Sequence, residues 1–279
     1  MSTAYLPYGL LALTHLTLLL GQEKLSSLVF ALALSTALYL ERVSWPGVGL
    51  ILLFAALAYA MKRLQARPAS TLYGFVTGVF ALVALAFLSH KIPGFQNLVV
   101  LDAHRFAVDS QPFTMYLNFD KPLVFTFGFL LMRPKGLAQS PLRTLLLATL
   151  ASACILLVPA FAMSYVRLDP KLAPETLLWA LNNFFFVCAA EEMLFRGILQ
   201  NELAHWLKRE RLALTIAAVL FGLIHFHGGV PYVFLATLAG LVYGEAYRRT
   251  GRIDVAMGVH FLVNLLHILF FSYPSLVTT

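Results

Sequence analysis

The sequence predicts an all-α protein, a polytopic bundle of about eight to ten transmembrane helices. Of its 279 residues, 60% are hydrophobic and only 12% are charged, and the mean hydropathy is +0.80. Soluble domains contain about 45–50% apolar and about 25% charged residues, so this chain is far more apolar than they are. Several stretches reach or approach the roughly 20 apolar residues that a helix needs to cross a bilayer.

Ten apolar segments are the expected spans, at residues 5–20, 25–40, 47–61, 72–89, 121–132, 142–166, 175–196, 212–226, 231–247 and 253–273. The first has no basic region before it and no clear small-residue cleavage site, so we expect a retained helix and not a signal peptide. The fifth is the shortest. Residues 90–120 form the longest polar connection, and the Pro and Asp residues that interrupt it argue against a span.

Two cysteines and the basic clusters complete this outline. Cys154 and Cys188 both fall inside expected spans, so we read them as small core residues and not as a disulfide framework. The net charge of +7 comes from short clusters between apolar runs, a pattern of cytoplasmic loops, so nucleic acid is not an expected partner. If the spans alternate across the membrane as counted, the basic clusters all lie on one side of it. These clusters are Lys62, Arg63, Arg67, Arg133, Lys135, Arg143 and the runs 208–211 and 248–252.

The seventh span contains "CAAEEMLFRGI" (188–198), where charged residues interrupt an apolar helix. Such residues cost a few kcal/mol on insertion scales, so they must be paired, face water or work there. Glu192 and Arg196 are spaced i, i+4 and can form an ion pair on one face. Glu191 points about 100° away and has no basic residue one turn before or after it, which suits a general base or a proton carrier. A structural polar clamp between helices is the alternative.

The extent of this helix stays open in the sequence. Residues 175–207 can form one helix of roughly 48 Å, which is longer than the bilayer core. The same residues can instead bend near Gly197 into an amphipathic surface stretch, "ILQNELAHWLKRE".

Polar residues also interrupt two later spans. In "FGLIHFHGGVP", His225 ends an apolar helix, where a lone histidine is also compatible with a core position, and His227 is expected in the following loop. In "VHFLVNLLHILF", His260, Asn264 and His267 follow at i, i+4 and i+7 and share one face. Two hydrogen-bonding side chains a turn apart in an otherwise apolar helix predict the wall of a polar cavity.

Together these side chains are able to carry out an acyl-transfer reaction. A carboxylate with a neighbouring histidine can deprotonate and aim a water, and donors such as His260 and Asn264 can stabilise the oxyanion that forms at an amide. The sequence contains no HExxH, no GxSxG and no P-loop motif. Neither cysteine has a histidine at a recognisable spacing, so a thiol mechanism is poorly supported.

Three motifs resemble those of a known family. "EEMLFR", "FGLIH" and "HFLVN" are similar, in order and spacing, to the EExxxR, FxxxH and HxxxN/D motifs of the CPBP intramembrane proteases. That family includes the Rce1-type CAAX prenyl endopeptidases and bacteriocin-immunity homologues. The resemblance covers about residues 175–270 and implies the following roles: water activation by Glu191, water orientation by His225, support of the site by Glu192 and Arg196, and an oxyanion site of His260 and Asn264.

The resemblance also implies the reaction and its setting. We expect a CAAX-protease-like hydrolase that cleaves a membrane-anchored protein or peptide, a multi-pass protein in the cytoplasmic membrane of a prokaryote, and the lipid bilayer as its surroundings. Residues 133–279 would form the catalytic helical domain, and residues 1–132 would supply accessory helices. The implied mechanism depends on glutamate and requires no cofactor. Zinc held by Glu191, His225 and His260 is the alternative.

Two other classes of function compete with this one. A proton-coupled transporter would use Glu191 as a proton relay, but it is expected to have broken helices or repeated halves, which the sequence does not show. A non-catalytic immunity or scaffold protein would retain the helix bundle as a scaffold without catalysing a reaction. Such a protein would be expected to have lost at least one of the polar positions, and all are present.

Overall fold

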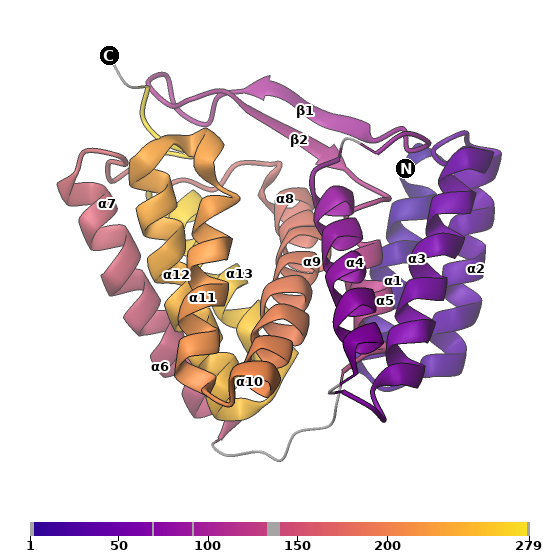
Figure 1. Cartoon of the computed structure of the whole chain (residues 1–279). Coiled ribbons are helices and arrows are strands. Elements are labelled where there is room, and N and C mark those ends of the chain that lie inside the picture. The colour runs from indigo at the N-terminus through magenta and orange to yellow at the C-terminus, as the bar shows by residue number, and fades with distance from the viewer. Residues whose placement is uncertain (1–2, 69, 91, 133–139, 278–279) are drawn as a thin grey trace. The chain divides into compact units, whose positions relative to one another are not determined.

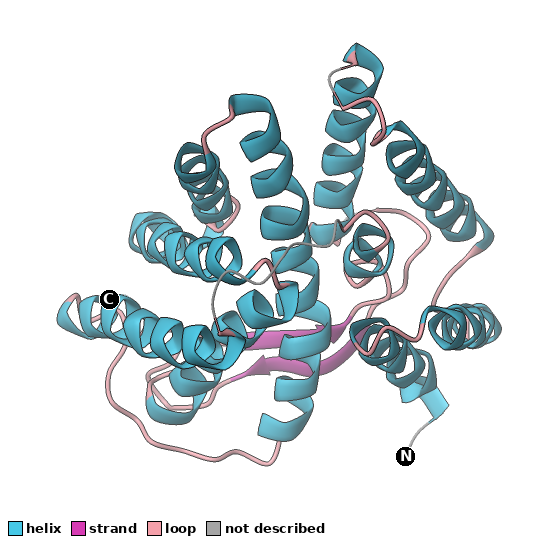
Figure 2. Cartoon of the chain, turned by 90° about the horizontal axis from the view of Figure 1, so that it is seen from below, coloured by secondary structure: helices cyan, strands magenta, loops and turns pink. Residues whose placement is uncertain are grey.

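A computed structural model describes residues 3–68, 70–90, 92–132 and 140–277. It confirms the predicted helical fold, and Figures 1 and 2 show helices as nearly all of the regular structure. The described residues of the polar connection 90–120 contain no membrane span, as predicted, but this connection is more than a loop. It forms the strands β1 (Leu98–His104) and β2 (Phe113–Leu117), which pair as a two-stranded sheet.

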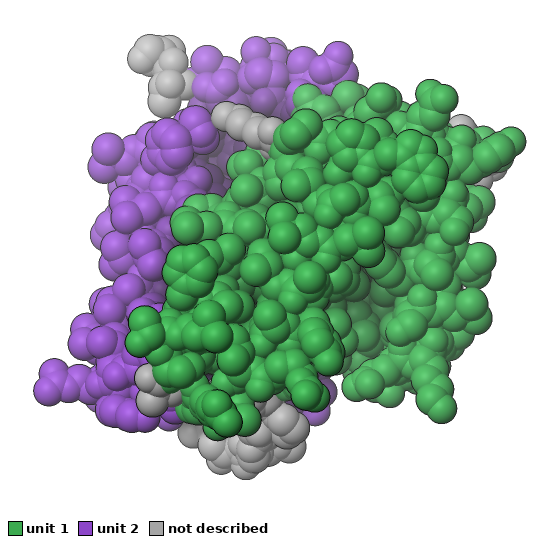
Figure 3. All heavy atoms as spheres, turned by 45° about the vertical axis from the view of Figure 1, so that its right-hand side comes forward, with its two compact units in different colours: residues 1–99, 116–133, 185–198 green, residues 100–115, 134–184, 199–279 purple. Residues whose placement is uncertain are grey.

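The chain divides into two compact units, shown in different colours in Figure 3. Unit 1 consists of residues 1–99, 116–133 and 185–198, and unit 2 of residues 100–115, 134–184 and 199–279. The helices of unit 1 are α1 (Leu6–Leu19), α2 (Glu23–Tyr39), α3 (Trp45–Leu64), α4 (Thr71–Leu88), α5 (Leu123–Phe129) and α9 (Ala189–Glu192). Those of unit 2 are α6 (Pro141–Ser152), α7 (Val158–Ala162), α8 (Thr176–Asn182), α10 (Asn201–Leu207), α11 (Glu210–Leu223), α12 (Gly229–Thr250) and α13 (Ile253–Phe270).

Six helical stretches of the described residues are long and apolar enough to cross a membrane: Trp45–Leu64, Thr71–Leu88, Pro141–Ala162, Thr176–Leu207, Phe226–Thr250 and Ile253–Phe270. Four other predicted spans coincide with shorter helices: α1, α2, α5 and α11. Large apolar side chains on the spans are exposed, for example Leu52, Phe75 and Leu147. A surface of this kind suits lipid, and the chain is an integral, multi-pass membrane protein.

The stretch Thr176–Leu207 is one continuous helix of 32 residues, which decides between the two alternatives in the sequence. It does not turn into a separate surface segment at Gly197. Two wide π-helical turns, Asn183–Cys188 and Met193–Gln200, flank the short α-helical turn α9 that carries both glutamates. Such turns are rare and occur frequently at functional sites. In an apolar stretch of 18 residues within this helix, 61% is buried inside the protein. The corresponding share is 22–44% in the other five spans.

Aromatic packing and one close helix approach hold unit 1 together. Phe54 on α3 stacks on Phe80 of α4, with ring centroids 4.7 Å apart. Gly128 on α5 has no room for a side chain, because a β-carbon there would collide with Met193. The absence of a side chain therefore lets α5 approach the glutamate-bearing helix closely.

Unit 2 is built on the antiparallel pair α11 and α12, which touch where Gly240 lies against Ala218. Gly251, with φ of +66°, ends α12 in a left-handed conformation that glycine adopts without strain. Arg248 Nη1 lies 3.6 Å from Glu210 Oε2, so the basic runs 208–211 and 248–252 meet at one end of this unit, as predicted. The predicted cluster residues Arg133 and Lys135 lie outside the described residues.

Candidate active site

The carboxylate group of the candidate site lies in unit 1. Arg196 Nη1 donates a hydrogen bond to Glu192 Oε1 at 2.9 Å, and the side chains are 1% and 0% exposed. The predicted i, i+4 pair is therefore confirmed, and it is completely buried. Because both side chains are removed from water, the attraction between them offsets part of the cost of burying the two charges.

Glu191 differs from the prediction, which gave it no basic partner. Lys121 Nζ lies 2.7 Å from Glu191 Oε1, and the two side chains are 10% and 9% exposed. The prediction was wrong because it considered only neighbours on the same helix, whereas this cation comes from 70 residues earlier in the chain. The sequence contains one signal, a lysine at the start of the apolar run "DKPLVFTF" (120–127). At that position a lysine is easily interpreted as a residue that marks the boundary of a span.

The histidines of the candidate site lie in unit 2, around the ring of Phe221. His225 follows one turn after it, as predicted, with its ring centroid 4.8 Å away and its Nδ1 2.7 Å from the Phe221 carbonyl oxygen. His260 on α13 lies edge-on to the same ring at 5.9 Å. It also stacks on Tyr243 of α12 at 4.7 Å, with an angle of 20° between the rings. The structure thus brings both histidines to one aromatic cluster.

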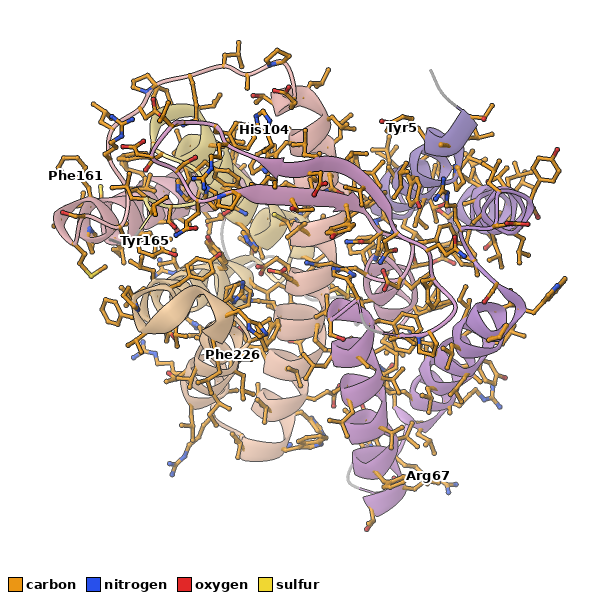
Figure 4. All side chains as sticks on the ribbon, turned by 90° about the horizontal axis from the view of Figure 1, so that it is seen from above. Tyr5, Arg67, His104, Phe161, Tyr165 and Phe226 are labelled. Atoms are coloured by element: carbon orange, nitrogen blue, oxygen red, sulfur yellow. The ribbon has the colours of Figure 1, made fainter. Side chains whose placement is uncertain are left out.

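The loops around this cluster belong to the same unit. His227 lies in the exposed turn after His225, as predicted. Phe226 of that turn and Tyr165, which follows α7, are labelled in Figure 4. Tyr165 stacks on Tyr232 at 6.2 Å, and Tyr232 lies edge-on to His225 at 5.3 Å.

Asn264 has a partner that the sequence analysis missed. Its Nδ2 donates to Oδ1 of Asn183, on the long helix, at 3.3 Å. This bond orients the amide, and the tandem asparagines in the apolar run "LNNFFFV" (181–187) are the signal that would have revealed it. His267, predicted on the same face, has its Nε2 3.2 Å from the Ser272 carbonyl oxygen, in the segment that follows α13.

The cysteines contribute no cross-link. The two residues form no disulfide with each other; Cys188 is buried, as predicted, but Cys154 is exposed, so the expected core position was wrong for Cys154. Cys188 precedes Glu191 by one turn on the long helix.

The fold and these residues define a class: a multi-pass helical membrane protein with buried, ion-paired glutamates in its most buried span. Residues 173–266 match the model of a family, the type II CAAX prenyl endopeptidase Rce1-like proteins, which confirms the predicted resemblance. The matched segment contains all six predicted site residues. No curated protein and no solved structure is significantly similar to the chain.

Proposed function

We propose that this protein is an intramembrane endopeptidase that hydrolyses a peptide bond of a membrane-anchored protein or peptide, using water activated by Glu191. The observation that carries the proposal is a buried, ion-paired glutamate inside the segment that matches the peptidase family. A charged carboxylate in a membrane helix is costly and is usually functional. We also propose the cytoplasmic membrane of a prokaryote as its location.

The proposed reaction uses the residues of the three motifs. Glu191 accepts a proton from the water, whose oxygen attacks the peptide carbonyl carbon, and His225 orients that water. His260 and the amide of Asn264 donate hydrogen bonds to the oxyanion of the tetrahedral intermediate. The C–N bond then breaks, and the leaving nitrogen receives the proton that Glu191 holds. Glu192 and Arg196 keep the helix around Glu191 rigid.

A prenylated peptide ending in a CAAX sequence, mixed with the purified protein in detergent micelles, tests the reaction. Mass spectrometry should find one cleaved bond, and in ¹⁸O-labelled water the new carboxylate should gain one labelled oxygen. Proteoliposomes provide the comparison. A proton flux that requires Glu191, together with intact peptide, would establish the transporter in place of the peptidase.

Chelators separate glutamate from metal activation. We expect cleavage to continue in EDTA and in 1,10-phenanthroline, because a buried carboxylate and an orienting histidine can activate water without a Lewis acid. Elemental analysis of the purified protein should then give far less than one zinc per chain. Stoichiometric zinc, whose removal abolishes cleavage and whose addition restores it, would establish the zinc alternative with Glu191, His225 and His260 as ligands.

Asn264→Ala tests the oxyanion site. The substitution should lower kcat by roughly 10²–10³, the effect of losing one oxyanion donor in other enzymes, and leave the metal content unchanged. Asn201→Ala is the matched control, because Asn201 also makes a side-chain hydrogen bond, to Tyr247 Oη at 2.7 Å, outside the proposed site. Equal rates for the two variants would remove Asn264 from the mechanism.

A further inference from the structure

We propose that Lys121 is a positioning residue for Glu191: its ammonium group fixes the place and the charge of the carboxylate that activates water. This inference rests on the proposed function. It also gives the N-terminal part of the chain a task in the reaction, since Lys121 lies outside residues 173–266, which match the peptidase family.

The contact itself is short and buried. The Lys121 ammonium and the Glu191 carboxylate are 2.7 Å apart, the distance of a strong charge-assisted hydrogen bond, and neither side chain is more than 10% exposed. A long lysine side chain loses rotamer freedom when it is buried. A buried lysine is also rare in proteins unless it is paired. This contact is therefore a buried ion pair of unit 1 and not a surface ion pair.

The backbone of Lys121 is itself held in place. Asp120 is fully buried, and its Oδ1 accepts a hydrogen bond from the Lys121 backbone N–H at 2.9 Å. The same oxygen lies 3.1 Å from Nδ1 of His90, and Nε2 of His90 lies 3.1 Å from Nδ2 of Asn118. Pro122 then begins the turn into α5. A chain of polar contacts thus fixes the point from which the lysine side chain extends.

The charges around Glu191 explain why a cation is needed there. Glu192 is its neighbour in the sequence, and Arg196 is engaged by Glu192 at 2.9 Å. On the same helix Cys188 is a buried thiol one turn away, and α1 contributes His15, whose Nδ1 contacts the Phe185 carbonyl oxygen at 2.9 Å. A second carboxylate beside Glu192 in a low-dielectric interior would be repelled, so an ammonium in contact with Glu191 stabilises its ionised form.

Substitutions of Lys121 test the role through activity. Lys121→Met should lower kcat on the prenylated CAAX peptide by about 10- to 100-fold, less than the loss of the base itself, with KM changed by no more than about threefold. Lys121→Arg keeps the positive charge and should restore most of the rate. In a Glu191→Gln background, Lys121→Met should have no further effect, because both substitutions act on one group.

A matched control removes another paired lysine. Lys171 lies in a loop of unit 2, with Nζ 3.0 Å from Asp169 Oδ2, and its side chain is 15% exposed. Lys171→Met deletes the same charge and should keep the rate within about twofold. If Lys121→Met behaves like Lys171→Met, the proposed role of Lys121 is wrong while the proposed peptidase function stands.

Infrared spectroscopy reads the charge of Glu191 without any cleavage assay. At neutral pH, Lys121→Met should show the carbonyl stretch of a protonated carboxyl, which the wild type, Lys121→Arg and the double variant Lys121→Met/Glu191→Gln lack. Failure of the wild type to cleave the peptide would overturn the proposed function but leave this test intact. The absence of the new band in a folded Lys121→Met variant would overturn the role of Lys121.

Thermal melting covers the case in which the single variant folds but is too unstable for the cleavage assay. Lys121→Met removes the ammonium that contacts the buried carboxylate, whereas Lys121→Met/Glu191→Gln removes both charges. The double variant should therefore melt at a higher temperature than Lys121→Met alone. If both melt equally early, the lysine acts only through packing, and the positioning role is excluded.

Discussion

Glu191→Gln is expected to lower kcat by roughly 10²–10⁴ while the protein still inserts and folds. The amide has nearly the same shape as the carboxylate, and its oxygen can still accept a hydrogen bond from Lys121 Nζ. It cannot, however, take a proton from water. The measurement is the initial rate of cleavage of the prenylated peptide, taken together with the melting temperature of each protein in detergent.

Glu202→Gln is the matched control for this substitution. Glu202 lies on the same long helix, and both glutamates are 7% exposed, so the chemical change and the degree of burial are equal. We expect Glu202→Gln to keep nearly the full rate. A fully active Glu191→Gln protein would end the mechanism proposed for Glu191. Equal losses in both variants would indicate that a buried charge anywhere on this helix is needed for structure.

The comparison of Glu192 with Glu191 shows which contacts the sequence can predict. The Glu192–Arg196 pair is local, because helix geometry alone places residues i and i+4 on one face, and the structure confirms it at 2.9 Å. The partner of Glu191 depends on how α5 packs on the long helix, through the close approach at Gly128. No periodicity within one segment contains that information, so the contact with Lys121 was missed.

The fold shows the same division between local and tertiary causes. Hydropathy predicted the helical segments, since each one must satisfy its own backbone hydrogen bonds in lipid. The sequence did not decide whether the helix continues past Gly197, because glycine weakens a helix by only about 1 kcal/mol and packing often overrides it. Ile198 on the next position is buried, and Gln200 donates to the Gly244 carbonyl oxygen at 3.0 Å, contacts that favour continuation.

The roles of His225, His260 and Asn264 stay predictions. Within unit 2 the structure adds two contacts that the motif pattern did not specify, the Tyr243 ring stacked on His260 and the Asn183 amide bonded to Asn264. The division of the chain at residues 132 and 133 also stays a prediction. A contribution from Lys121 would mean that the N-terminal part is more than an accessory to the peptidase.

Arg196→Ala is expected to destabilise the protein by about 3–5 kcal/mol, the cost of stranding one charge of a buried pair. Glu192 is completely buried, so water cannot replace the guanidinium that Arg196 supplies. The change should appear as an early melting transition of the detergent-solubilised protein. Glu192→Gln in the same chain removes the stranded charge, so the double variant should recover part of the loss.

An exposed pair supplies the contrast that isolates burial as the cause. Arg167 Nε lies 2.8 Å from Asp109 Oδ2, and both side chains are about half exposed. Arg167→Ala breaks an ion pair of similar length but leaves Asp109 in water, so it should cost no more than about 1 kcal/mol. If Arg196→Ala melts normally and yet loses turnover, the arginine acts on the substrate or in catalysis, and the pair with Glu192 is not what stabilises the helix.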